Sequence, residues 1–273
     1  MEWSLVLVSQ GIESTIRDGE EGWQLEVSGQ EYERALEVIR QYRSENQRWL
    51  WRREYFKPGL LFDWGSLAWV VLTILFYVLS AYTVDLDRPG HMDSTEVSKG
   101  QWWRLFTAIW LHADLGHLAG NVTLGLILLG LAMARYGTGV GLLASYLAGA
   151  GGNIAAWLLA ARPHYSLGAS GMIMGSLGLL AIQSLYIWRK TPKSAQYILA
   201  RLVSGLMLFI LLGLAPGSDV FAHLGGFLAG ILLGTLATLR LNLAQRGGVN
   251  LLAGLLFVGL VIYPWWLALR HDG

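Results

Sequence analysis

The sequence of 273 residues contains no cysteine and few charged residues. The absence of cysteine excludes disulfide bonds, thiol nucleophiles and cysteine-based metal sites. Charged residues make up 14% of the chain, against about a quarter in an ordinary soluble domain. No glutamate follows Glu96, and lysine occurs after that point only at Lys99, Lys190 and Lys193. The net charge of +1 provides no basic footprint for nucleic acid, so we expect no nucleic-acid partner.

Two classes of membrane peptidase are disfavoured by what is missing. The chain has no H-E-x-x-H pattern, which argues against a zinc peptidase. Its long apolar stretches, described below, also lack a pair of aspartates near their centres, which argues against an intramembrane aspartyl protease. His112 and His117 could supply two metal ligands, but no third ligand is evident. We therefore predict neither a metal ion nor a cofactor.

Residues 1–48 are rich in charge and predict a small α+β domain. A strand is expected at Leu5–Val8, a hairpin over Thr15–Val27 and a helix from about Gln30 to Ser44. The helix would present one apolar face, made of Tyr32, Leu36, Ile39 and Tyr42. Because about fifty residues bury only a small core, we expect this domain to dimerise, to dock on the membrane or to be weakly stable.

The rest of the chain predicts an all-α polytopic membrane helix bundle. Residues 49–60 mix basic and aromatic side chains, as a juxtamembrane linker at the lipid headgroups does. Seven apolar stretches follow, each near the roughly 20 residues needed to cross a bilayer. They lie at about 62–83, 113–134, 138–160, 169–187, 196–214, 220–239 and 249–268. We assign 61–241 to a six-helix bundle and 242–273 to a seventh helix with a tail.

The basic residues predict the orientation of these spans. With a cytoplasmic N-terminus, the inner segments hold Arg43, Arg48, Arg52, Arg53, Lys57, Arg135, Arg189, Lys190, Lys193, Arg240 and Arg246. The outer connections then hold Arg88, Lys99, Arg104, Arg162 and Arg270. The excess lies inside, as the positive-inside rule requires, and the seventh span places the C-terminus outside. We recognise no organelle signal, so we predict a bacterial plasma membrane.

Five polar residues fall at one depth near the predicted outer surface. His117 and Asn121 lie in the first turns of span two, Ser170 opens span four, and His223 lies in the first turn of span six. His112 sits just before span two. Spans two, four and six all start on the same face, so counting crossings brings these groups together. Polar groups in a bilayer are expensive, and their convergence predicts a functional site.

The five groups have the chemistry of an activated serine. A serine becomes a nucleophile when a base removes its proton, and His223 lies at a matching depth. The developing oxyanion would find donors in His112, Asn121 and the Ser170 backbone N–H. Asp219, one turn before His223, is predicted to cap span six rather than to complete a triad.

Small residues predict close packing of spans four and six. They recur on span four at Gly171, Gly175 and Gly178, and on span six at Gly226, Gly230 and Gly234. Such spacing lets two helix backbones approach closely, which a Ser–His contact near 3 Å needs. The same features also have plain structural explanations, since a buried serine often bonds to its own helix. Ser176 is predicted to be of that kind.

Several motifs together resemble the rhomboid family of intramembrane serine proteases. Gly168-Ala169-Ser170-Gly171 is similar to the nucleophile motif of that family, and the stretch from Ala222 to Gly230 is similar to its base helix. His112-x4-His117-x3-Asn121 resembles its second helix, and Trp103-Arg104 resembles the W-R signature of its first outer loop. The resemblance covers about residues 60–240, and a seventh helix occurs in only some members.

The resemblance implies roles for these residues. Ser170 would attack the peptide bond and His223 would act as base and then acid, without a third carboxylate. His112, Asn121 and the Ser170 N–H would stabilise the oxyanion. Structural roles near the site would belong to His117, Trp103, Arg104, Gly168, Gly171, Met174, Gly226 and Gly230. Met174 replaces an aromatic residue that is frequent in the family. Span five would be a lateral gate for transmembrane substrates.

Two other classes of function are weighed against this one. An inactive rhomboid-like binding or quality-control factor would not need Ser170 and His223, which are both present. A transporter would be expected to carry inverted repeats and polar groups at mid-membrane, and neither is evident. The sequence therefore predicts a serine endopeptidase that acts on transmembrane proteins within the lipid bilayer.

Overall fold

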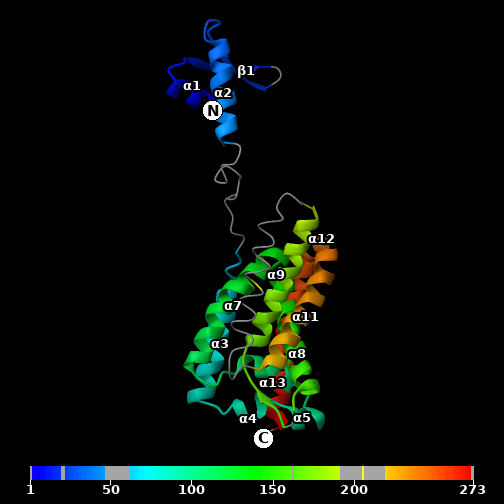
Figure 1. The fold of residues 1–273 in the computed structure, drawn as a ribbon. Coiled ribbons are helices and arrows are strands. Elements are labelled where there is room, and N and C mark those ends of the chain that lie inside the picture. Colours follow the sequence, from blue (N-terminus) through cyan, green and yellow to red (C-terminus); the bar gives the residue numbers. More distant parts are fainter. Residues whose placement is uncertain are drawn as a thin grey trace. The chain divides into compact units, whose positions relative to one another are not determined.

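The computed structural model describes residues 2–19, 22–46, 62–161, 163–190, 205 and 219–271. The chain divides into two compact units, residues 1–59 and 60–273. Figure 1 shows the elements of each unit, and each unit is described by itself. The linker predicted at 49–60 and the fifth span predicted at 196–214 lie outside the described residues.

The N-terminal unit is a two-stranded hairpin packed with two helices. Strands β1 (Ser14–Gly19) and β2 (Gly22–Val27) pair antiparallel, as predicted, and α2 spans Tyr32–Asn46. The strand predicted at Leu5–Val8 is wrong, because α1 is a helix over Glu2–Ser9. Leu7 is fully buried there while Leu5 is 70% exposed. A strand would place these two residues on the same face, whereas the helix buries only one of them.

The small core of this unit differs in part from the expected face. Leu7, Ile12 and Ala35 form it, with Leu25, Val27, Val38 and Ile39 packed around them. Tyr32, predicted on the buried face of the helix, is exposed. The helix therefore turns Ala35 rather than Tyr32 toward the core, where it packs with Leu7 and Ile12.

The second unit is a bundle of long apolar helices (Figure 1). Five described helices are long and apolar enough to cross a membrane, namely α3 (Gly65–Tyr82), α7 (Leu115–Tyr136), α8 (Thr138–Leu159), α11 (Val220–Leu239) and α13 (Gly247–His271). A sixth helix, α9 (Ser170–Lys190), contains a shorter apolar part, Ser170–Tyr186. A short helix, α12 (Leu241–Ala244), links α11 to α13. The predicted class, an all-α membrane bundle with a small α+β N-terminal domain, is confirmed.

The connection between α3 and α7 is a folded segment that packs on the bundle. It contains α4 (Asp87–Gly90), β3 (Met92–Asp93), α5 (Ser94–Ser98), α6 (Arg104–Thr107) and the 3₁₀ turn η2 (Ala108–Trp110). Its apolar residues Leu105, Ile109 and Trp110 are buried. β3 pairs antiparallel with β4 (Tyr165–Ser166), which belongs to the connection between α8 and α9.

Glycines allow α8, α9 and α11 to pack with almost no gap. A Cβ atom added to Gly226 would lie 2.2 Å from the carbonyl oxygen of Gly171, and one added to Gly230 would lie 2.1 Å from that of Gly175. No real Cβ approaches an atom so closely, so the two backbones touch along this line. The packing predicted for spans four and six is therefore present.

The seventh predicted span, α13, is bound to the bundle by polar and aromatic contacts. The side-chain oxygen of Asn250 accepts the backbone N–H groups of Gly139 (3.0 Å) and Val140 (3.1 Å) at the start of α8. Trp265 is buried against the connection, where a Cβ on Gly90 would lie 2.6 Å from its ring. The helix is thus an integrated part of the bundle.

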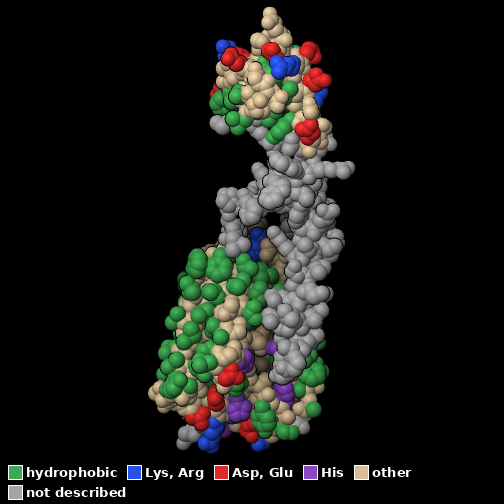
Figure 2. Space-filling view, turned by 60° about the vertical axis from the view of Figure 1, so that its left-hand side comes forward, with side chains coloured by type: hydrophobic (Ala, Val, Ile, Leu, Met, Phe, Trp, Pro, Cys, Tyr) green, Lys and Arg blue, Asp and Glu red, His purple; other side chains and the backbone are tan. Residues whose placement is uncertain are grey.

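The flank of the bundle is apolar. Figure 2 shows hydrophobic side chains over the visible flank and charged and histidine side chains gathered at one end. On α11, leucines recur every fourth residue and are 42–62% exposed: Leu224, Leu228, Leu232 and Leu236. Exposed apolar side chains in this periodic pattern suit a lipid environment and not water.

Candidate active site

Ser170 and His223 meet at the starts of two helices. Ser170 is the first residue of α9, and His223 lies in the first turn of α11. The Nε2 atom of His223 lies 2.7 Å from Oγ of Ser170, a normal hydrogen-bond length. His223 is 5% exposed. Proton transfer between a serine and a buried histidine base needs this geometry.

The turn before Ser170 depends on a glycine. Gly168 has φ +126°, a conformation that L side chains rarely adopt. A Cβ there would also lie 2.7 Å from the ring of His117. The backbone N–H of Gly168 donates to the Ala108 carbonyl at 2.9 Å. The motif thus positions Ser170 by tying its turn to η2 and seating it on the ring of His117.

The sequence predicts three hydrogen-bond donors for the oxyanion. The N–H of Ser170 belongs to the first turn of α9, where amides lack acceptors within the helix. Asn121 is buried, and its side-chain nitrogen donates to the His117 carbonyl at 3.1 Å. That nitrogen carries a second hydrogen that can serve a ligand. His112 is also buried, and neither of its ring nitrogens has a partner among the described residues.

A cavity of about 590 Å³ opens beside these groups. Ser170, His223, Asn121 and His117 all line it, whereas His112 is not among the described lining residues. The ring of His112 instead lies edge-on to that of His117, with centroids 5.2 Å apart. Four of the five polar groups predicted to converge thus line one cavity, and His112 lies against one of them, His117.

Met174, one turn after Ser170, also lines the cavity and is 2% exposed. Ser176, on the same helix, is fully buried, and its Oγ lies within hydrogen-bond distance of Ser145 Oγ (2.9 Å) and of the Met172 carbonyl oxygen (3.1 Å). This is the structural role predicted for that serine. Within the part of the chain that the structure describes, no group of three or more acidic or histidine side chains could hold a metal ion.

Sequence comparisons identify the family to which this chain belongs. The Rhomboid domain profile matches residues 99–240, just over half of the chain. The chain belongs to the rhomboid family. It is 36% identical over 166 residues to "RHOMBOID-like protein 1" of Arabidopsis thaliana, a match that covers 60% of this chain and 42% of that protein. The family and the apolar helices together identify an integral membrane protein.

Two relatives are named as proteases. "Rhomboid protease GluP" of Bacillus subtilis is 34% identical over 205 residues, which cover 71% of this chain and 38% of GluP. "Rhomboid-like protease 3" of Toxoplasma gondii is 31% identical over 193 residues, which cover 67% of this chain and 72% of the relative. The chain spans about two fifths of the length of the plant protein and of GluP.

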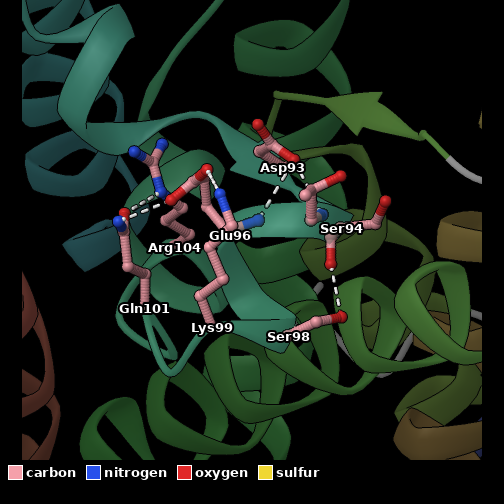
Figure 3. Close-up of polar contacts among 8 residues, drawn as sticks. Asp93, Ser94, Glu96, Ser98, Lys99, Gln101 and Arg104 are labelled. Atoms are coloured by element: carbon pink, nitrogen blue, oxygen red, sulfur yellow. Dashed lines mark hydrogen bonds and ion pairs between the residues drawn. The ribbon is translucent and has the colours of Figure 1, made fainter.

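The first connection of this rhomboid bundle is organised around Arg104 (Figure 3). Arg104 is buried; its Nη1 donates to the carbonyls of Arg88 (3.0 Å) and His91 (2.9 Å), and its Nε donates to Gln101 (2.7 Å). Gln101 in turn donates to Glu96 at 2.8 Å. Trp103 is buried beside it, with its ring centroid 5.2 Å from that of His271. These contacts fold the connection that carries Gly90 and His91.

Sequence reasoning missed one hydrogen bond beside the rhomboid site. Nε2 of His164 lies 2.8 Å from Oδ2 of Asp219. Asp219 lines the cavity, and its Oδ1 caps α11 by accepting the Ala222 N–H at 2.9 Å, as predicted. No periodic signal in the sequence marks His164, because it lies in a short connection whose path is set by tertiary contacts.

Proposed function

We propose that this chain is an intramembrane serine endopeptidase in which Ser170 and His223 form a catalytic dyad. The 2.7 Å contact between Ser170 Oγ and His223 Nε2, beside a cavity, is the observation that carries the proposal. The naming of two rhomboid relatives as proteases supports it. The reaction is hydrolysis of a peptide bond in a transmembrane segment.

The chemistry follows from the two side chains. Oγ of Ser170 attacks the carbonyl carbon while its proton passes to Nε2 of His223. The tetrahedral intermediate then collapses, and His223 gives the proton to the leaving amine. Water attacks the resulting ester of Ser170 while His223 takes its proton. The bond between the acyl carbon and Oγ of Ser170 then breaks, His223 returns the proton to Oγ, and the carboxylic acid product is released. The two steps return both side chains to their starting state.

The oxyanion would be held by the donors around Ser170. The Ser170 N–H carries the partial positive charge of a helix start, and Asn121 offers its second amide hydrogen. We keep His112 as a third donor, because its buried nitrogens have no partner among the described residues. It is not among the described residues that line the cavity, whereas Asn121 is. We therefore assign His112 a smaller contribution than Asn121.

The proposed catalytic dyad of Ser170 and His223 needs no carboxylate as a third catalytic residue. The two oxygens of Asp219, the nearest acid in the sequence before His223, contact the Ala222 N–H and His164. Asp219 therefore stands as a cap. The 2.7 Å contact with Ser170 and burial help to orient the imidazole.

The substrates we propose are single transmembrane segments. Peptide bonds in a helix are shielded, so the segment must unwind locally before Ser170 can attack. A small residue at the cut and a readily unwound stretch beyond it favour this step. The lateral gate predicted at 196–214 falls outside the described residues. We also propose a bacterial plasma membrane with the N-terminus in the cytoplasm, and the domain limits 1–48, 49–60, 61–241 and 242–273.

Labelling by a fluorophosphonate tests the nucleophile, and cleavage of a reporter transmembrane segment tests the activity. We expect wild-type protein to be labelled at Ser170. Ser170→Ala and His223→Ala should each lower kcat by about 10⁴-fold or more, while the unfolding temperature in detergent stays near that of the wild type.

Ser176→Ala is the matched control, because Ser176 is a buried serine on the same helix that bonds only structural partners. It should retain labelling and cleavage. Labelling of Ser170→Ala as strong as that of the wild type, or cleavage retained in either dyad variant, would reject the proposal. A folded wild-type protein that is neither labelled nor active would instead favour a rhomboid-like binding factor.

A further inference from the structure

The connection that delivers Ser170 is fixed on one side by strand pairing. Met92 pairs with Ser166, and Asp93 pairs with Tyr165. The backbone N–H of Ser94 donates to the His164 carbonyl, and the His164 N–H donates to Ser94 Oγ, both at 3.0 Å. Ser94 is fully buried. The backbone of His164 is thereby anchored to the first connection, independently of its side chain.

The side chain of His164 extends the other way, to the start of α11. It reaches Asp219 at 2.8 Å, and the two side chains are 21% and 15% exposed. Asp219 also holds the helix start through the Ala222 N–H, and its carbonyl accepts the N–H of His223 at 2.9 Å. One carboxylate therefore joins the pre-serine connection to the turn that carries the base.

The glycine contacts alone do not fix the position of α11 along α9. Because Gly171 and Gly226 have no side chain, they set how closely α9 and α11 approach. They offer no directional bond that would stop one helix from sliding along the other or rotating against it. The 2.7 Å contact between Ser170 and His223 is sensitive to both motions. A directional, charge-assisted bond between the two helix starts opposes them.

We propose that His164 and Asp219 are positioning residues of the protease. Their hydrogen bond holds the start of α11, and His223 with it, against the connection that delivers Ser170. This inference rests on the proposed function and adds two residues to its site. Neither side chain takes part in the transfer of protons or in bond formation.

Three variants separate the bond from the other roles of these residues. His164→Ala removes the ring but leaves the backbone bonds to Ser94. Asp219→Ser keeps a good helix cap, but its hydroxyl is too short to reach His164. His164→Gln can still offer an amide N–H to Asp219.

Cleavage of the reporter segment should separate kcat from KM. We expect His164→Ala and Asp219→Ser each to lower kcat by about 10- to 100-fold, with KM within about twofold of the wild type. His164→Gln should recover most of the lost rate. The double variant His164→Ala/Asp219→Ser should be no slower than the slower single variant, because both remove one contact. Lys99→Ala, which removes an exposed ion pair with Glu96 in the first connection, should leave kcat unchanged.

The rate of fluorophosphonate labelling at Ser170 distinguishes the two proposals. Absence of labelling in the wild type would reject the protease itself. Normal labelling of the wild type together with unchanged kcat in His164→Ala would reject only the positioning role. Multiplied losses in the double variant, or no recovery in His164→Gln, would also reject it. If Asp219→Ser does not fold, the comparison of His164→Ala with His164→Gln decides.

Discussion

The position of the Ser170 hydroxyl is set by the backbone conformation and by the buried side chains around it. Ser170 is an ordinary alcohol until the turn at Gly168, with φ +126°, places it at the first position of α9. The ring of His117 occupies the space that a side chain at 168 would need. Two residues that touch no reacting atom therefore set where the hydroxyl of Ser170 lies.

Burial makes the protonation of His112 unfavourable in the folded protein, so His112 links folding stability to pH. Desolvation, and then the nearby His117, lower the pKa of His112 to about 4, against about 6.5 in an unfolded chain. Between these values the unfolded chain binds a proton that the folded protein does not. The stability contributed by His112 is therefore complete above about pH 6.5 and falls by about 1.4 kcal/mol for each pH unit below it, until about pH 4.

Unfolding in detergent should reveal this dependence. We expect the free energy of unfolding of the wild type to drop more steeply between pH 6.5 and 4.5 than that of His112→Gln, which has no titrating ring. The difference between the two curves isolates His112 from the other acidic and histidine groups. Parallel curves would show that His112 takes up a proton equally in both states.

At the scale of helices, one face of α11 packs tightly on α9 and the opposite face is exposed on the flank of the bundle. Gly226 and Gly230 touch the backbone of α9, while the leucines on the other side are exposed on the flank. A substitution on the leucine face changes contacts with lipid. A substitution on the glycine face must push two helices apart, and it would move His223 away from Ser170.

Alanine at Gly226 or Gly230 should therefore be costly. We expect each variant to lose about 1–3 kcal/mol of stability, as overpacked cores do, and most of its cleavage activity. Gly259→Ala is the control on α13, because a Cβ there meets nothing within 4 Å. Stability is measured by denaturation in mixed micelles. Equal behaviour of Gly230→Ala and Gly259→Ala would mean that α9 and α11 can separate without penalty.

Asn250 should support α8 from another helix. Its oxygen accepts two N–H groups at the start of α8, and its nitrogen donates to the Ala244 carbonyl at 2.6 Å. Asn250→Ala should cost about 0.5–2 kcal/mol, the usual range for loss of a helix cap. Asn250→Asp keeps the acceptor and should recover part of this loss. Unfolding titrations compare the three proteins, and no difference between Asn and Ala would refute the capping role.

The sequence predicts the long helices well and the short segments poorly. The spans expected at 138–160 and 220–239 appear as Thr138–Leu159 and Val220–Leu239, because bilayer thickness fixes their length and Asp219 caps the second. At the site, depth alone brings Ser170 and His223 together. The bond between His164 and Asp219 could not be predicted, since it depends on how a connection without periodicity folds.

At the scale of the whole molecule, the absence of cysteine makes orientation directly measurable. The basic residues favour a cytoplasmic N-terminus and an external first connection. Single cysteines can be placed at Lys99 in that connection and at Gly247, at the start of α13, where a Cβ meets nothing within 4 Å. Both positions are exposed.

A membrane-impermeant maleimide should label Lys99→Cys in intact cells. Gly247→Cys should be labelled only after the membrane is permeabilised, because α13 is predicted to begin on the inner side. The unmodified chain provides a background without thiols. The reverse pattern would invert the topology and place the candidate site on the cytoplasmic side.

The capping of α8 by Asn250 bears on how the protein is made. The side chain that accepts the first amides of α8 lies 111 residues further along the chain than Gly139. A ribosome therefore delivers α8 to the translocon well before its acceptor has been synthesised. Chains released early by a premature stop codon carry a start of α8 that lacks this side-chain acceptor.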